Sequence, residues 1–500
     1  MKISAQAAPF LHIETPADGV ATLYVSTLHR GDPAVQSAIA SCVKKYPGIR
    51  LSPVPLDELR VLQQQNAVTA VSADHSAEQA RVIELFREAK KRHASDIHFL
   101  IGMDNLTQVQ MRIHGDLETY CTLETEEGMT LASTIVMSMC DVAEKSFNPK
   151  RQQDGRIKKD FLTGLGLFGA RYSHTATEFG LYVVMRILPD EGKAPPTLDQ
   201  LGYLPEQQTL IHRMLRIPEG VIILSGPTGS GKSTSLRSFS AKYLAITGNL
   251  RRLLTIEDPP EGRIHGAVQT AIIADRNNPD DVSQAWVRAI SGSMRLDPDA
   301  IIVGEIREAN SARTTLSAGR SGHVVLSTTH SNDAIGILAR MTDSFGIPLA
   351  EITDPQMVVG LLSQRLVQLL CPHCKRTWDD VQATLTSEEL TLLTEHCDTA
   401  MLAFRNRAGC THSDCYKGIT GRRVIAEVIR PDARFMHLLR HQETIAARSY
   451  WVHTLGGITR RQHLEHYLRD GLVDPLDADR ICPLDEDRRT LLPPEVLNEH

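Results

Sequence analysis

The sequence predicts an α/β protein whose larger part is built on a parallel sheet. Beyond Gly202, short apolar runs alternate with segments that suit helices, which is the pattern of a parallel sheet covered on both faces. The first run leads directly into a glycine-rich segment, in the order strand, loop and helix. The runs are residues 221–224, 253–256, 300–303 and 324–326.

The length and composition predict a folded chain of more than one domain. The chain has 500 residues, of which 42% are hydrophobic and 23% charged, which is ordinary for a globular protein of two or three domains. Its longest apolar runs are far shorter than the roughly 18 residues of a membrane-spanning helix. No apolar signal segment follows Met1, so we expect a cytoplasmic protein.

Charge and cysteine content argue against a nucleic-acid-binding protein and against a disulfide-bonded protein. The formal net charge is -6 and the basic clusters are short, so direct nucleic-acid binding is not expected. Nine cysteines in a chain without a secretion signal favour free thiols or a metal site over a disulfide framework.

Five regions are expected along the chain. Residues 1–75 mix strand-like and turn residues and suggest no chemistry, whereas residues 76–188 show the alternating helix and strand patterns of a smaller α+β domain. Residues 189–200 are rich in proline, glycine and charge, as in a linker. The α/β domain then covers residues 201–480, and residues 481–500 are expected to form a loosely packed tail.

The glycine-rich segment has the composition of a phosphate-binding loop. Its glycines let successive backbone N–H groups turn toward phosphates at a helix N-terminus, Lys232 reaches the β and γ oxygens, and the Ser233 hydroxyl ligates Mg²⁺. An ordinary glycine-rich turn is the alternative, but every position of the motif is filled in the right context. The segment, with the residue after it, is Gly226, Pro227, Thr228, Gly229, Ser230, Gly231, Lys232, Ser233 and Thr234.

Acidic residues at two strand ends are candidates for the hydrolytic step. Glu305 follows the run 300–303, where a carboxylate can activate a water beside the γ-phosphate. Many P-loop proteins place a metal-binding Asp immediately before this position, but here it is Gly304, so another carboxylate must share the work. Glu257 or Asp258, at the end of an earlier strand, can supply it. Each of these carboxylates, taken singly, is equally compatible with a solvated strand end.

Three further motifs follow the phosphate loop and together resemble the secretion ATPases of type II secretion and type IV pilus systems. Residues 256–261 resemble the aspartate box of that family, and residues 321–334, which contain His330, resemble its histidine box. Its atypical Walker B segment is similar to residues 295–299 with 303–307. Parts of the family's N-terminal domain resemble residues 94–98, 112–115 and 153–156, so the resemblance covers about residues 77–430.

The resemblance implies a fold and a set of residue roles. It implies a ring of six subunits, each with a PAS-like α+β N-terminal domain and a RecA-like P-loop ATPase domain. It assigns Lys232 and Ser233 to phosphate and Mg²⁺, Glu305 to the attacking water with support from Glu257, and His330 to sensing the γ-phosphate. Considered alone, His330 would more often be a surface histidine.

The resemblance also implies that arginines of the N-terminal domain reach the nucleotide phosphates when the two domains close. Arg171 and Arg186 lie on predicted strands that match this position. Their charge would neutralise negative charge that develops in the transition state. Surface salt bridges are the alternative for both residues.

Four cysteines suggest a structural zinc site. Cys371 and Cys374 form a Cys-x₂-Cys pair, and Cys410 and Cys415 provide a second pair with four residues between them instead of two. His412 is therefore an alternative to Cys415 as the fourth ligand, and unliganded thiols are the alternative to a metal site. A zinc-knuckle insertion in the loop 371–415 is what the resemblance implies for assembly-type members of the family.

The function implied by the resemblance is a hexameric ATPase at the cytoplasmic side of the inner membrane. It would couple ATP hydrolysis to movement of an inner-membrane platform protein. Two alternatives stay open: a type IV secretion ATPase that moves DNA or protein, whose members usually lack the cysteine loop, and a nucleotide switch that does not hydrolyse. The catalytic residues do not separate type II secretion from pilus assembly or from its type IVB thin-pilus branch.

Overall fold

The chain divides into two compact units, Met1–Asp190 and Glu191–His500, and each is described by itself. The computed structural model describes residues 7–14, 21–46, 48–56, 58–59, 76–141, 146–190, 192, 194–274 and 278–493. Within these ranges, no helix is both long and apolar enough to cross a membrane.

The beginning of the N-terminal unit contains a small three-stranded sheet. Its strands β1 (Leu11–Glu14), β2 (Thr22–Ser26) and β3 (Arg50–Val54) lie in that order, with β1 antiparallel and β3 parallel to β2. Helix α1 (Pro33–Lys45) joins β2 to β3, and its Val35 and Cys42 are buried with Leu23 and Val25 of β2. Part of the region 1–75 is therefore a folded β-α-β element, although residues 60–75 lie outside the described residues.

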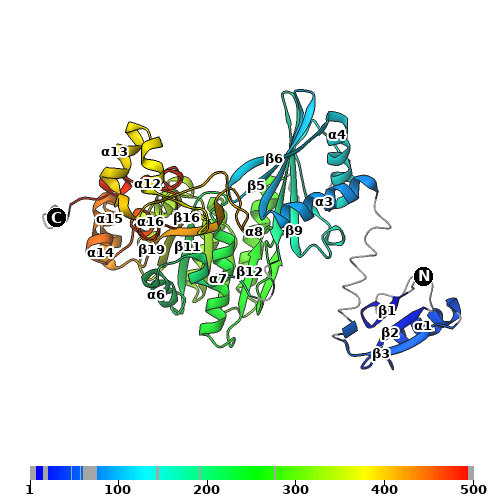
Figure 1. Cartoon of the computed structure of the whole chain (residues 1–500). Helices are drawn as coiled ribbons and strands as arrows, with labels where there is room; N and C mark the ends of the chain where they lie inside the picture. Colours follow the sequence, from blue (N-terminus) through cyan, green and yellow to red (C-terminus); the bar gives the residue numbers. More distant parts are fainter. Residues whose placement is uncertain are drawn as a thin grey trace. The chain divides into compact units, whose positions relative to one another are not determined.

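The rest of the N-terminal unit is an antiparallel sheet with helices on one side, which is an α+β arrangement (Figure 1). The alternation of Ile97, Phe99 and Ile101 buries one face of β4 beside α3, where Val82 and Phe86 are also buried. The likeness of this domain to a PAS domain stays a prediction. In sheet order the strands are β6 (Asp116–Glu124), β5 (Leu106–Ile113), β4 (Ala94–Met103), β10 (Gly180–Pro189), β9 (Leu167–Thr177), β8 (Gln153–Ile157) and β7 (Cys140–Asp141), with helices α3 (Ala77–Lys91) and α4 (Thr125–Thr134).

The C-terminal unit contains the predicted parallel sheet, which confirms the α/β fold class. All four predicted apolar runs form neighbouring parallel strands at its centre, and only β19 runs antiparallel, to β16. In sheet order the strands are β13 (Ala267–Ala271), β12 (Leu253–Glu257), β14 (Ala300–Val303), β15 (Val324–Thr329), β11 (Gly220–Ser225), β16 (Val358–Leu370) and β19 (Ile419–Ile429).

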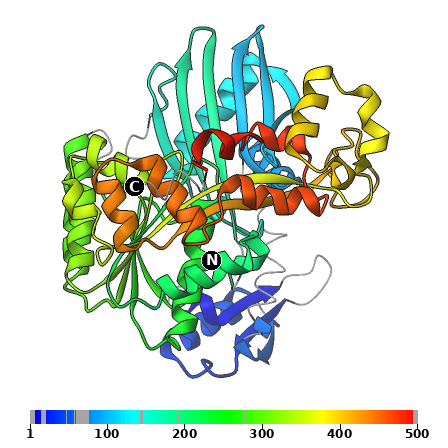
Figure 2. The same cartoon turned by 90° about the vertical axis from the view of Figure 1, so that its left-hand side faces the viewer.

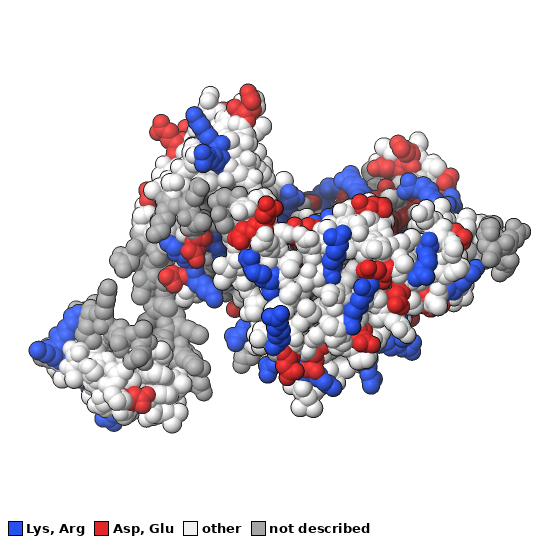
Figure 3. Space-filling view, turned by 180° about the vertical axis from the view of Figure 1, so that it is seen from behind, with Lys and Arg blue, Asp and Glu red and all other residues white. Residues whose placement is uncertain are grey.

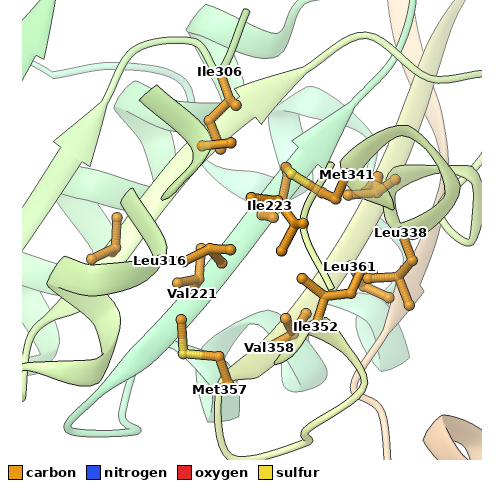
Figure 4. Close-up of a cluster of buried hydrophobic side chains, with 14 of the residues drawn as sticks. Val221, Ile223, Ile306, Leu316, Leu338, Met341, Ile352, Met357, Val358 and Leu361 are labelled. Carbon is orange, nitrogen blue, oxygen red and sulfur yellow. The ribbon is translucent and has the colours of Figure 1, made fainter. Parts of the chain in front are cut away.

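Helices cover both faces of this sheet. On one face, Val221 and Ile223 of β11 pack with Leu316 of α9 (Ala309–Arg320) and Trp286 of α8 (Pro279–Ser293), as part of the cluster drawn in Figure 4. On the other face, Ile222 packs with residues of α6 (Pro205–Met214) and α7 (Lys232–Ile246). Because both faces are covered, the central strands are apolar without alternation, which is why they were recognisable in the sequence.

Further helices follow the sheet and pack along β16 and β19 (orange in Figure 2). The cysteine-rich insertion lies before β19 and contains β17 (Arg376–Thr377), α12 (Trp378–Val381), α13 (Ser387–His396) and β18 (Ala403–Phe404). The remaining helices are α5 (Leu198–Leu201), α10 (Gly336–Ala339), α11 (Leu349–Ile352), α14 (Ala433–Arg440), α15 (Thr444–His453), α16 (Arg460–Arg469), α17 (Pro475–Asp479) and α18 (Glu486–Thr490).

The expectation of a loosely packed tail is wrong for its described part. Cys482 and Leu484 are buried in the cluster that α16 forms with the sheet. The backbone N–H of Leu492 donates to the Ser449 hydroxyl at 2.8 Å. A few apolar and hydrogen-bonding residues among many charges are therefore enough to pack this segment against the rest of the unit. Residues 494–500 lie outside the described part of the chain.

Candidate nucleotide and metal sites

Four predicted features meet at one edge of the C-terminal sheet. Strands β12, β14, β15 and β11 are neighbours and run in parallel, so their carboxyl ends lie at the same edge. These ends carry Glu257, Glu305, His330 and the glycine-rich loop, respectively. In open α/β sheets this edge is where ligands bind.

The glycine-rich loop joins the fully buried strand β11 to α7. At Gly226, φ is 148°, and a Cβ would lie 2.4 Å from the carbonyl oxygen of Gln364. Gly231 caps α7 with φ of 83°, a left-handed conformation that favours glycine. Both glycines are therefore required by the shape of a loop that turns backbone N–H groups toward the N-terminus of a helix.

Gln364 supports this loop, a role that was not predicted from the sequence. Its Nε2 donates to the Ser230 carbonyl at 2.6 Å, and its Oε1 accepts from the Tyr203 hydroxyl at 2.6 Å and the Ser235 hydroxyl at 2.9 Å. Gln364 is fully buried on β16. A long polar side chain in a strand that begins with a buried apolar run was the available signal, because a buried amide needs partners.

Lys232 is the first residue of α7, and its ammonium group contacts the loop itself. The Nζ atom donates to the carbonyl oxygens of Gly226 at 2.7 Å and Pro227 at 3.1 Å. Burial lowers the pKa of Lys232 to about 8, although the negative charges of Glu305 and Glu261 act in the opposite direction. The lysine is thus a partly desolvated cation beside the loop, where an anion would be attracted strongly.

Glu305 and His330 contact each other directly. The distance from His330 Nε2 to Glu305 Oε1 is 2.8 Å, and Arg307 Nε donates to the other carboxylate oxygen, also at 2.8 Å. Burial lowers the pKa of His330, and the nearby charge of Lys232 lowers it further. A neutral imidazole with its proton on Nε2 therefore donates to the Glu305 carboxylate near pH 7.

Glu257 lies beside Gly304, the position at which many P-loop proteins have an Asp. A Cβ at Gly304 would lie 3.7 Å from Cγ of Glu257. The Glu257 carboxylate accepts from the Thr255 hydroxyl at 2.6 Å and from Gln269 Nε2 at 3.1 Å. Glu257 is therefore held next to Gly304 by hydrogen bonds to neighbouring side chains, and it is partly buried.

Hydrogen bonds also join the strand that leads to His330 to the segment that carries Glu305. The Ser327 hydroxyl donates to the Val303 carbonyl and the Thr328 hydroxyl to the Gly304 carbonyl, both at 2.7 Å. The backbone N–H of Ile306 donates to the Thr328 carbonyl at 2.8 Å. The histidine and the glutamate are thus fixed relative to each other by the backbone as well as by their own contact.

The two candidate arginines belong to the N-terminal unit. Arg171 of β9 and Arg186 of β10 are directly opposite each other and so share one face of the sheet. Arg186 Nε lies 3.0 Å from Oδ1 of the buried Asp96. This ion pair corresponds to the alternative weighed for Arg186, while contact of either arginine with nucleotide phosphates stays a prediction.

The four cysteines of the insertion converge. Their sulfur atoms all lie within 4.8 Å of one another, with 3.8 Å between Cys371 and Cys410 and between Cys374 and Cys415. Tetrahedral Zn–S bonds of about 2.3 Å place sulfurs about 3.8 Å apart, so the donor set fits Zn²⁺. His412 instead stacks on His373, with ring centroids 4.1 Å apart. The geometry thus favours Cys415 over His412 as the fourth donor.

Charge on the molecular surface is mixed. On the face shown in Figure 3, Lys and Arg side chains of the described residues are interspersed with Asp and Glu. This distribution differs from the continuous basic stripe of proteins that hold a phosphate backbone.

Both the sequence and the fold are similar to those of known proteins. The model of the family described as "Type II/IV secretion system protein" matches residues 72–474. The chain is 31% identical over 447 residues to the "Type IV pilus assembly ATPase PilB" of Thermus thermophilus, covering 89% of this chain and 47% of that protein. It is 33% identical over 373 residues to the "Type II secretion system ATPase E" of Vibrio cholerae, covering 74% of this chain and 69% of that protein.

Among solved structures, the fold is similar to that of the Legionella pneumophila ATPase DotB, with a TM-score of 0.52 and 20% identity, covering 82% of this chain and 97% of that chain. The pilus retraction motor PilT with bound ADP gives a TM-score of 0.50 at 22% identity, covering 84% of this chain and 99% of that chain. The chain spans about half the length of the Thermus relative. Since the family model matches most of the chain, this protein belongs to the type II/IV secretion system protein family.

Proposed function

We propose that this protein hydrolyses ATP to drive type IV pilus assembly or type II secretion. The observation that carries the proposal is the position of the Glu305 carboxylate, which His330 and Arg307 hold at the sheet edge that also bears the phosphate loop. The names of the Thermus and Vibrio relatives support the cellular role.

Each residue at the sheet edge has one task in this proposal. The loop N–H groups at the N-terminus of α7 bind the phosphates, and the Lys232 ammonium exchanges the loop carbonyls for the β and γ oxygens. The Ser233 hydroxyl holds Mg²⁺, which neutralises charge on the phosphates. Glu305 accepts a proton from the attacking water, and Glu257 adds the carboxylate that Gly304 lacks. His330 exchanges its hydrogen bond to Glu305 for one to the γ-phosphate and so distinguishes ATP from ADP.

Assembly and coupling form the second part of the proposal. Six chains form a ring at the cytoplasmic face of the inner membrane, where closure of the two units brings Arg171 and Arg186 to the phosphates and moves a platform protein. Membership of the family supports this part. Sedimentation with Mg²⁺ and ATP should give a particle of six chains, and an inner-membrane platform protein from the same cells should co-purify with it.

Steady-state release of phosphate from ATP tests the catalytic part. Lys232→Ala should abolish turnover and weaken ATP binding, because it removes a phosphate ligand, whereas Glu305→Gln should retain binding and stop turnover. Glu351→Gln is a matched control, because Glu351 forms a half-exposed surface ion pair with Arg320 at 3.0 Å. Turnover near the unsubstituted rate in Glu305→Gln would disprove the assignment. A protein that binds ATP without any turnover would be the non-hydrolysing switch.

We also propose that the four cysteines bind one structural Zn²⁺ per chain. The convergence of their sulfur atoms supports this proposal. Metal content should be near one zinc per chain in protein never exposed to chelator, and Cys415→Ser should lower it while His412→Ala should not. The opposite result for these two variants would identify His412 as the ligand. Absence of zinc from the unsubstituted protein would exclude the site.

A further inference from the structure

An arginine of a C-terminal helix holds the loop that follows His330. Residues 330–334, called here the histidine loop, follow β15. Arg460, the first residue of α16, donates through Nη1 to the carbonyl of Asn332 and through Nη2 to Glu486 Oε1 at 2.7 Å. Arg460 is only 3% exposed, so both interactions are shielded from water. The Arg460 guanidinium therefore connects the histidine loop to α16, and its ion pair with Glu486 connects it to α18.

A buried carboxylate holds the end of the same loop. Glu427 of β19 accepts the backbone N–H of Ala334 at 3.1 Å through Oε2, and its Oε1 pairs with Arg448 of α15. Burial raises the pKa of Glu427, but the guanidinium groups of Arg448 and Arg460 outweigh it and hold the pKa below its ordinary value. An ionised carboxylate with no exposure is costly without its partners, so this arrangement restricts the movement of Ala334.

The other side of the histidine loop contacts the strand that leads into the phosphate loop. The hydroxyl of Ser225, the last residue of β11, lies 3.4 Å from the Asp333 carbonyl oxygen and 3.1 Å from the Leu362 carbonyl oxygen, so the two carbonyls share one donor. The Ser331 hydroxyl donates to the Asp333 carbonyl at 2.8 Å, and the Asp333 carboxylate accepts from the N–H of Gly336, the first residue of α10, at 2.7 Å. The loop is thus held between β11 and the C-terminal helices, and a shift of these helices would displace His330.

We propose that Arg460 and Glu427 are positioning residues for ATP hydrolysis, through which the C-terminal helices determine where His330 lies relative to Glu305. The inference rests on the proposed function. The contact between His330 and Glu305 is 2.8 Å long, and a displacement of about 1 Å can lower a rate by about a hundredfold. The phosphate loop binds nucleotide through other groups. Loss of the positioning contacts should therefore lower turnover and leave ATP binding nearly unchanged.

Arg461 provides a contrast within the same helix. It is also buried, at 8% exposure, and its guanidinium contacts the Leu484 carbonyl at 2.8 Å, the His396 carbonyl at 2.6 Å and Glu465 at 2.6 Å. Glu465 lies in α16, Leu484 in the turn between α17 and α18, and His396 in α13 of the cysteine-rich insertion, so none of these partners is in the histidine loop. A change at Arg461 should therefore disturb the packing of α16 without moving His330.

The test compares Arg460→Lys with Arg461→Lys in the full-length protein. Lysine keeps the charge but lacks the fork that reaches Asn332 and Glu486 together. Arg460→Lys should lower kcat by about tenfold to a hundredfold, with KM and ATP affinity within about twofold of the unsubstituted protein. Arg461→Lys should keep kcat within about twofold, whatever its effect on the melting temperature.

A second variant covers the case in which Arg460→Lys does not fold. Glu486→Gln removes one partner of Arg460 at a side chain that is 14% exposed, and it should lower kcat in the same direction by a smaller factor. Equal losses of kcat at Arg460 and Arg461, or unchanged kcat in both Arg460→Lys and Glu486→Gln, would overturn the inference while leaving the proposed function intact. Absence of turnover in the unsubstituted protein would overturn the proposed function and this inference with it.

Discussion

Replacement of Gln364 by leucine should lower both the free energy of unfolding of the C-terminal unit and its affinity for ATP. The reason is that this side chain connects the proposed phosphate loop to the sheet by hydrogen bonds. It donates to the Ser230 carbonyl and accepts from the hydroxyls of Tyr203 and Ser235. Leucine has a similar volume but no polar atom, so the change removes three hydrogen bonds with little change in packing.

The magnitude follows from the groups that are left behind. The Ser230 carbonyl loses the amide that donates to it inside the protein, which costs about 1–3 kcal/mol. Tyr203 and Ser235 keep a hydrogen bond of 3.3 Å to each other. The loss of the Gln364 acceptor therefore costs less at these two hydroxyls, about 1 kcal/mol. The free energy of unfolding should therefore fall by about 2–4 kcal/mol. ATP affinity should fall about tenfold if binding must supply about 1.4 kcal/mol of this to order the loop.

Denaturation followed by tryptophan fluorescence measures the first quantity, because Trp286, Trp378 and Trp451, the only tryptophans of the chain, all lie in the C-terminal unit. Calorimetric titration with ATP measures the second. Gln368→Leu is the matched control, since Gln368 lies on the same strand but accepts from Arg405, at 3.3 Å, away from the phosphate loop. An unchanged ATP affinity in Gln364→Leu, or an equal loss in Gln368→Leu, would refute this account of the loop.

Three further predictions concern the arginines, the cysteines and the lysine. Arg171→Ala and Arg186→Ala should leave the circular dichroism spectrum unchanged and lower turnover about tenfold or more, and full turnover in the double variant would assign both to surface ion pairs. Cys374→Ser should remove zinc, as measured by elemental analysis, and lower the melting temperature without changing ATP affinity, and the thiol of Cys415 should react with thiol reagents in the metal-free protein. Because burial lowers the pKa of Lys232 to about 8, the lysine is partly neutral above that pH and must take up a proton to bind phosphate. Calorimetric titrations with ATP in buffers of different ionisation enthalpy should thus show that binding takes up a proton at about pH 8.5 but not at about pH 6.5. Equal proton uptake in Lys232→Ala would assign the uptake to another group.

The sequence alone determined the features that are local in the chain. A strand, a glycine-rich turn and a helix N-terminus form one continuous segment, so the loop at residues 226–233 could be proposed as a phosphate-binding loop without knowledge of the fold. The central strands were recognisable for a related reason, because a parallel sheet covered on both faces needs uninterrupted apolar runs. The order of the motifs then sufficed to indicate the family, which the family model confirms.

Only the tertiary structure decided which distant residues meet. Gln364 is 134 residues from Ser230, and Glu427 is 93 residues from Ala334. At such separations, no local sequence pattern predicts either contact. The spacing of the second cysteine pair was compatible with Cys415 or His412, and the turn of the insertion placed the Cys415 sulfur, rather than the His412 ring, among the other thiols. Buried polar groups find partners wherever the fold brings donors and acceptors together, and that encounter depends on the packing of the whole unit rather than on local sequence.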